Sequence, residues 1–129
     1  MPLVHLAIIL ALIEFIVFGF AVGRARVRYH VPAPATSGNE VFERYFRVQM
    51  NTLEQLVIFL PSILLFAHYF SAYLAAALGA LFIIGRALYF RSYVKEPKSR
   101  EPGFMLSLIP NLVLLIGAMI GALRALALS

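Results

Sequence analysis

Residues 43–67 of the chain read ERYFRVQMNTLEQLVIFLPSILLFA. The second half, residues 56–67, is apolar, whereas the first half carries charges and amides. On a helix, side chains three or four positions apart share one face. The polar residues with these spacings are Arg44, Arg47, Asn51 and Glu54. Ionisable groups at membrane depth are costly unless they are paired or hydrated. The stripe therefore predicts a water-filled cavity or a subunit interface at the edge of a membrane.

Most of the chain is as apolar as this segment. Of 129 residues, 62% are hydrophobic and only 13% are charged, against about 25% charged in a typical soluble domain. A membrane-spanning helix needs about 20 mostly apolar residues. We therefore predict one all-α domain over residues 1–129, an integral membrane four-helix bundle. The expected spans are residues 3–23, 48–70, 72–90 and 104–128, with the second helix beginning near residue 41.

The positive charge is concentrated in two predicted loops. Nine of the eleven Lys and Arg residues lie at residues 24–47 and 91–103. With four spans these loops share one face, which the positive-inside rule makes cytoplasmic. Both termini then face the opposite side. The net charge of +5 follows from this topology, or it also attracts anionic substrates.

Several kinds of chemistry are excluded or disfavoured. The chain has no cysteine, so disulfides, thiolate metal sites and a cysteine nucleophile are excluded. His5, His30 and His68 lie far apart in sequence, so we expect no metal site. No motif indicates nucleic-acid binding.

A second polar stripe lies at the end of the third span. Arg86, Tyr89 and Tyr93 are spaced by three and four residues, and Arg100 follows. The tyrosines are either anchors at the membrane interface or part of the opening of a binding site, which would be basic and rich in hydroxyl groups. Arginine binds carboxylates well, and glutamate binds an ammonium group. Together with Glu54, this opening therefore predicts a small zwitterionic ligand.

Two ionisable groups within the spans, Glu14 and Arg86, need partners. One interpretation is that an acid, Glu14 or Glu54, pairs with Arg86 and holds the bundle together. The other is that these groups serve function. Gln49 projects from a different side of its helix than Arg47 does, which suggests contact with more than one neighbour.

These motifs resemble a known family. ER at 43–44, RVQ at 47–49, Asn51, Glu54 and FLP at 59–61 resemble the second-helix signature of the membrane-associated proteins in eicosanoid and glutathione metabolism. GRALYF at 85–90 with Tyr93 resembles the end of that family's third helix. The Gln55-Leu56 continuation is similar to the microsomal glutathione transferase branch, which is common in bacteria.

The resemblance implies a homotrimer that holds glutathione, as cosubstrate, between neighbouring subunits near the cytoplasmic face. The residues implied to bind glutathione are Arg26, Arg47, Gln49, Asn51, Glu54, Tyr89 and Tyr93. Arg47 would bind a carboxylate, Glu54 the amino group, and Arg26 would reach in from the adjacent subunit. Arg100 is the implied catalytic residue, beside the sulfur. Val27 departs from the leukotriene-forming branch, which has a second arginine there; Arg26 and Arg28 flank it.

The implied activity is conjugation of the glutathione thiolate to lipophilic electrophiles, with a role in detoxification, or peroxidase activity toward lipid hydroperoxides. One alternative is a non-catalytic lipid-binding or scaffold protein of the same fold. A third possibility is a small drug exporter, in which Glu14 would carry protons.

Overall fold

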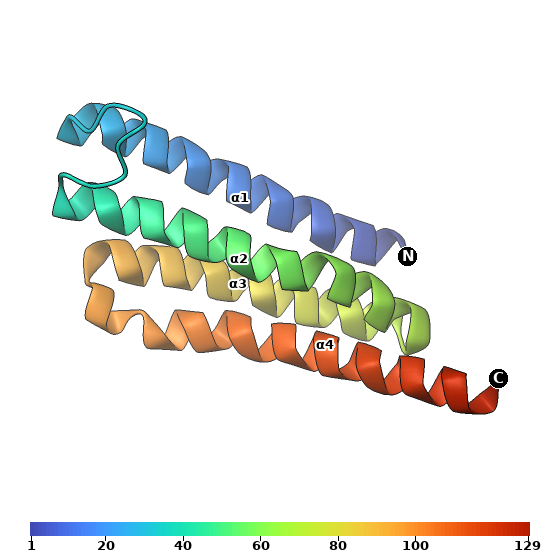
Figure 1. The fold of residues 1–129 in the computed structure, drawn as a ribbon. Helices are drawn as coiled ribbons and strands as arrows, with labels where there is room; N and C mark the ends of the chain where they lie inside the picture. Colours follow the sequence, from blue (N-terminus) through green and yellow to red (C-terminus); the bar gives the residue numbers. More distant parts are fainter.

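The computed structural model describes all 129 residues and is built from four long helices. They are α1 (Pro2–Tyr29), α2 (Glu40–Tyr69), α3 (Ala72–Lys95) and α4 (Glu101–Leu128), with the short 3-10 helix η1 (Pro97–Ser99) before α4. The helices pack side by side along their lengths (Figure 1). Each is long and apolar enough to cross a membrane. The predicted all-α four-helix architecture is confirmed.

Polar side chains set where two of the helices begin. The Asn39 side chain accepts a hydrogen bond from the Phe42 backbone N–H at 2.9 Å, and Ser71 caps α3 by accepting from Leu74 N–H at 3.2 Å. Such caps satisfy backbone donors that the first turn of a helix leaves free. Only two residues separate α2 from α3, so these helices form the expected tight antiparallel hairpin.

Both basic segments lie at the same end of the bundle. The α1–α2 connection and the turn between α3 and α4 lie together at the left of Figure 1, whereas the two chain termini lie at the other end. Much of the predicted loops 24–47 and 91–103 is helical, because α1 continues to Tyr29, α2 begins at Glu40 and α3 continues to Lys95. A helix needs no break at a membrane boundary, since its backbone hydrogen bonds are internal. The cytoplasmic orientation of this end remains a prediction.

The bundle has a narrow core, and much of its apolar surface faces outward. Phe59 stacks on Phe82 at 4.1 Å between ring centroids in the main core. Many large apolar side chains are exposed instead, among them Phe20 and Val57 at 75% and 68%. Large exposed apolar surface marks contact with lipid or with another protein, which fits a bundle embedded in a membrane.

The α3–α4 contact is close because two glycines face the neighbouring backbone. A Cβ at Gly85 would overlap the backbone of Ser107, and a Cβ at Gly103 would overlap the backbone of Tyr89. Small residues at such contacts let helices in membranes approach closely. This approach brings the start of α4 onto the end of α3, where the predicted site residues lie.

Candidate functional site

The centre of the site is a fully buried arginine. The Arg86 side chain on α3 is 0% exposed. Its Nε and Nη2 atoms donate to the Thr52 hydroxyl at 3.2 and 2.9 Å, and Nη2 also donates to Asn51 Oδ1 at 2.8 Å. Its Nη1 atom donates to the Ser107 hydroxyl on α4 at 3.1 Å. One guanidinium therefore joins α2, α3 and α4.

Of the two interpretations of Arg86, the one in which Glu14 or Glu54 forms an ion pair with it is wrong. The one ion pair within the chain joins Arg44 to Glu40 at 3.3 Å. The Arg86 donors instead meet neutral oxygens, which can satisfy a fixed guanidinium fork as a carboxylate does. Glu14 keeps a buried carboxylate oxygen without a hydrogen-bond partner, and Glu54 is exposed on α2.

The tyrosines extend this centre toward the basic end. The Arg86 guanidinium lies 4.4 Å from the centre of the buried Tyr89 ring. Tyr89 lies 5.4 Å from Tyr93, ring centre to ring centre, and the Arg100 guanidinium lies 6.0 Å from the Tyr93 ring. Arg100 is itself exposed and donates to the Pro97 carbonyl at 2.9 Å. Asn51, Tyr89, Tyr93 and Arg100 are thus brought into one continuous row.

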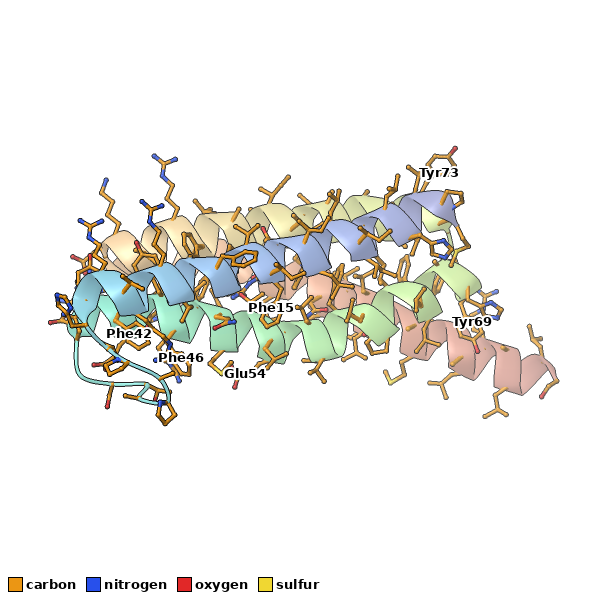
Figure 2. All side chains as sticks on the ribbon, turned by 90° about the horizontal axis from the view of Figure 1, so that it is seen from above. Phe15, Phe42, Phe46, Glu54, Tyr69 and Tyr73 are labelled. Carbon is orange, nitrogen blue, oxygen red and sulfur yellow. The ribbon has the colours of Figure 1, made fainter.

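The polar stripe of α2 divides between the inside and the outside of the bundle. Asn51 points toward Arg86, whereas Arg47 and Glu54 are exposed. Glu54 points away from the other helices (Figure 2). Arg47 and Glu54 make no hydrogen bond or ion pair within the chain, unlike Arg44, which donates to the Val94 carbonyl at 3.1 Å. Two unpaired groups of opposite charge therefore share one outer face of α2.

The remaining two predicted residues lie on the α1 side of the bundle. Arg26 donates to the carbonyls of Val31 and Ala35 at 3.2 and 2.6 Å and stacks over Phe42. Gln49 packs near Gly19 of α1. A single subunit therefore does not gather Arg26 and Gln49 with Tyr93 and Arg100.

The sequence patterns did not identify Thr52 and Ser107 as partners of Arg86. They also did not identify Asn111, whose side chain donates to the backbone carbonyl and the side-chain oxygen of Gln55, both at 3.1 Å. A signal was present in α4, because Gly103, Ser107 and Asn111 recur every four residues on one helical face. Polar and small residues at this spacing in an apolar helix indicate a face turned toward other helices.

A pocket that could hold a small molecule lies beside Arg100. This pocket, of about 540 Å³, lies at the start of α4 and is lined by Arg100, Glu101, Phe104 and Met105. Two of these side chains are apolar and two are charged. The pocket can therefore accept a molecule with an apolar body next to a guanidinium.

Several known proteins are similar to this chain in sequence. The model of the MAPEG family matches residues 4–120. Microsomal glutathione S-transferase 2 of Homo sapiens is 43% identical over 103 residues, which cover 79% of this chain and 70% of the human protein. Leukotriene C4 synthase of Rattus norvegicus is 35% identical over 83 residues, 64% of this chain and 55% of the rat protein. An uncharacterized protein of Synechocystis sp. is 46% identical over 114 residues, 88% of this chain and 83% of that protein. The chain thus belongs to the MAPEG family, which contains membrane enzymes that use glutathione.

Proposed function

We propose that this protein is a membrane-embedded glutathione transferase that works as a homotrimer. One observation carries the proposal: Arg47 and Glu54, of opposite charge, share an exposed face of α2 and have no partner in their own chain. Glu54 lies within the predicted span 48–70, where an unpaired charge is costly, and Arg47 lies at the edge of that span. A zwitterionic ligand between subunits would remove that cost.

Glutathione matches the spacing of these two groups. Seven residues of α-helix place Arg47 and Glu54 about 10 Å apart along the axis, and an extended tripeptide also spans about 10 Å. A guanidinium can hold a carboxylate through two parallel hydrogen bonds. Glu54 can accept hydrogen bonds from the ammonium group of the γ-glutamyl residue. Asn51, Tyr89 and Tyr93 would add hydrogen bonds along the peptide.

A second subunit would complete the site. The outer face of α2 also carries exposed apolar residues, including Leu53 and Val57. The same face therefore offers apolar side chains for contact with another subunit and charged side chains for a ligand. Arg26 and Gln49, on the α1 side, would serve the site of a neighbour. Contacts between two different faces of identical chains form a ring when the rotation between subunits closes, and the family resemblance implies a ring of three subunits.

Arg100 would activate the thiol. A free thiol has a pKa of about 8.5, so little is thiolate at neutral pH. Moving that pKa to about 6.5 takes about 2.7 kcal/mol of preferential stabilisation of the anion. A guanidinium beside the sulfur, in a partly desolvated site, can supply this. The thiol proton would leave to water.

The thiolate sulfur would then form a bond to an electrophilic carbon and displace its leaving group. The pocket beside Arg100, with Phe104 and Met105 in its wall, would hold the lipophilic substrate. Such a substrate dissolves in the bilayer, whereas glutathione dissolves in water. A site at the membrane edge lets the two meet.

Calorimetry on the purified protein in detergent tests the proposal. Wild type should bind glutathione, Arg47→Ala should lose at least tenfold in affinity, because a charged hydrogen-bonded pair is lost, and Arg91→Ala should bind as wild type does. Arg91 is the matched control, since it is exposed at the same end of the bundle and is not part of the proposed site. A folded wild type that binds no glutathione would overturn the proposal.

Turnover separates the enzyme from its non-catalytic alternative. Wild type should conjugate glutathione to 1-chloro-2,4-dinitrobenzene, forming the C–S bond and releasing chloride. Lipid hydroperoxide reduction, followed in parallel, tests the peroxidase activity. Glutathione binding without either reaction would favour a binding or scaffold protein.

A further inference from the structure

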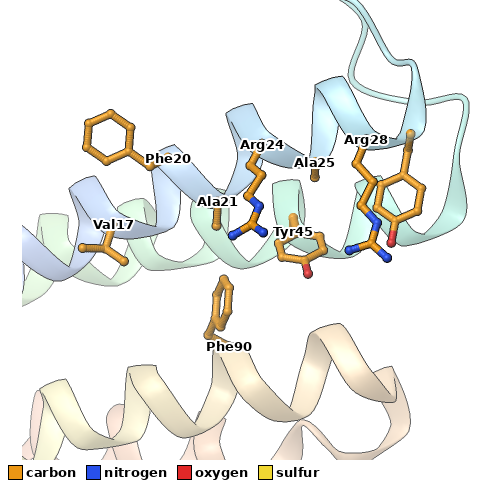
Figure 3. A pocket seen from close by; sticks show the side chains of 9 residues that line it. Val17, Phe20, Ala21, Arg24, Ala25, Arg28, Tyr45 and Phe90 are labelled. Carbon is orange, nitrogen blue, oxygen red and sulfur yellow. The ribbon is translucent and has the colours of Figure 1, made fainter.

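A second pocket lies at the basic end of the bundle. It has a volume of about 490 Å³ and opens between α1, α2 and α3 (Figure 3). Its lining includes Val17, Phe20 and Arg24 of α1, Tyr45 of α2 and Phe90 of α3. None of its lining residues is proposed to contact glutathione.

Two aromatic side chains of the lining, Phe90 and Tyr45, are held in place by packing. The Phe90 ring stacks on Phe18 with 4.7 Å between ring centres and an angle of 10° between planes. Tyr45 meets the other side of the cluster edge-on, 5.7 Å from Phe90. Because these rings restrain one another, this wall of the pocket is preformed and needs little ordering when a ligand binds.

Two arginines of the pocket have no hydrogen-bond or ion-pair partner in the chain. Arg24 and Arg28 are one helical turn apart, both are exposed, and their side chains extend from α1 toward α3 (Figure 3). Neither guanidinium donates a hydrogen bond or joins the one ion pair of the chain. The Arg28 guanidinium lies 5.6 Å from the centre of the Tyr29 ring, and this contact leaves its N–H donors free. Arg26, between them in sequence, instead donates to backbone carbonyls. The two free guanidinium groups suit an anion with several oxygens, such as a phosphate.

The pocket changes from charged to apolar along α1. Val17 lies seven residues before Arg24, which is about 10 Å along the helix toward its middle. Phe20, between them, is 75% exposed. A phospholipid has the same order of groups along the membrane normal, with a phosphate at the surface and acyl chains below.

We propose that this pocket binds an anionic phospholipid, with its phosphate between Arg24 and Arg28 and an acyl chain against Val17 and Phe20. A free phosphate would use the two guanidinium groups but would leave the apolar wall empty. The positive charge of Arg24 and Arg28 thus does more than orient the chain in the membrane, because both residues serve one preformed site.

Native mass spectrometry of the detergent-purified protein tests the site. The whole chain, as purified, is titrated with dioleoyl-phosphatidylglycerol and, separately, with dioleoyl-phosphatidylcholine. The variant is Arg24→Gln with Arg28→Gln. Its matched control is Arg91→Gln with Lys98→Gln, which removes two exposed positive charges from the same end of the bundle outside the pocket.

Wild type and the control should retain phosphatidylglycerol in preference to phosphatidylcholine. The pocket variant should bind phosphatidylglycerol roughly 10- to 30-fold more weakly, as expected for two lost contacts between arginine and anionic lipid. Equal weakening in variant and control would overturn the proposal, because binding would then follow net charge alone. Displacement of the lipid by millimolar inorganic phosphate would also overturn it and would identify a site for soluble anions.

The two proposals can fail separately. Glutathione affinity in the Arg24→Gln, Arg28→Gln variant should match wild type within twofold, which also shows that the variant is folded. Absence of glutathione binding in wild type would leave the lipid titration unaffected, since the altered residues belong only to the second pocket.

Discussion

The guanidinium of Arg86 donates two hydrogen bonds to the single hydroxyl of Thr52, from Nε at 3.2 Å and from Nη2 at 2.9 Å. A hydroxyl oxygen has two lone pairs, so Thr52 can accept both. The contact joins α2 to α3 in a part of the bundle where both side chains are buried. A charge is thus held inside the bundle by neutral oxygens.

Thr52→Val should lower the free energy of unfolding by about 1–3 kcal/mol, because two donors of a buried guanidinium lose their acceptor. Thr52→Ser keeps the hydroxyl and should lose less than half as much. Thermal unfolding in detergent, followed by circular dichroism, measures both. Equal stability of the Val and Ser variants would show that the hydrogen bonds contribute nothing.

Gly103→Ala should destabilise the protein by about 1–3 kcal/mol, since the added methyl group must push α4 away from the Tyr89 backbone. Gly23→Ala is the matched control, because a Cβ at Gly23 meets nothing within 4 Å. That change should leave stability unchanged or raise it by up to about 1 kcal/mol through helix propensity. The same unfolding assay compares them; a Gly103→Ala variant as stable as Gly23→Ala would contradict the close helix contact.

Arg100→Ala should reduce the turnover rate with 1-chloro-2,4-dinitrobenzene by roughly 10- to 100-fold, since about 1.4–2.7 kcal/mol of thiolate stabilisation is lost. Glutathione affinity by calorimetry should fall by less than threefold. Arg100→Lys keeps a positive charge and should be intermediate in rate. An equal loss in rate and affinity would assign Arg100 to binding instead of thiolate stabilisation.

Mixed trimers test whether two subunits share each site. Arg26→Ala and Arg47→Ala should each be inactive alone. If a site takes Arg26 from one subunit and Arg47 from the next, a mixture of trimers that all contain both variants should regain about a third of wild-type activity, because one of the three interfaces in each ring pairs an intact Arg26 with an intact Arg47. Co-expression with two affinity tags and purification over both columns provides the mixture. Tandem-purified protein with no activity would mean that both arginines come from one subunit.

Most of the fold could be predicted from the sequence. Four apolar stretches were long enough to span a bilayer, and the short connection after His68 required an antiparallel hairpin, which the structure confirms. The expected start of the second helix near Val41 agrees with α2 beginning at Glu40. These features depend on neighbours in sequence, so local pattern was sufficient.

The types of residue in the site could be predicted from the sequence, but the hydrogen bonds between side chains of different helices could not. Spacings within α2 placed Asn51 in one polar stripe, and spacings within α3 placed Arg86, Tyr89 and Tyr93 in another, with Arg100 shortly after it. The neutral partners of Arg86 could not be found in this way, because Ser107 lies 21 residues from it. Which residues meet across helices depends on helix rotation and on the close α3–α4 approach at Gly85 and Gly103.

The sequence by itself determined that this is a four-helix membrane protein of the MAPEG family with basic segments at one end, because hydropathy, loop length and the α2 motif are properties of contiguous residues. Only the tertiary structure decided that Arg86 is held by Thr52, Asn51 and Ser107, and that Arg24 and Arg28 share a pocket with Phe90. The physical reason is that hydrogen bonds and cavities depend on distances of a few ångströms between different helices. Those distances are set by packing, which the pattern along a single helix does not specify.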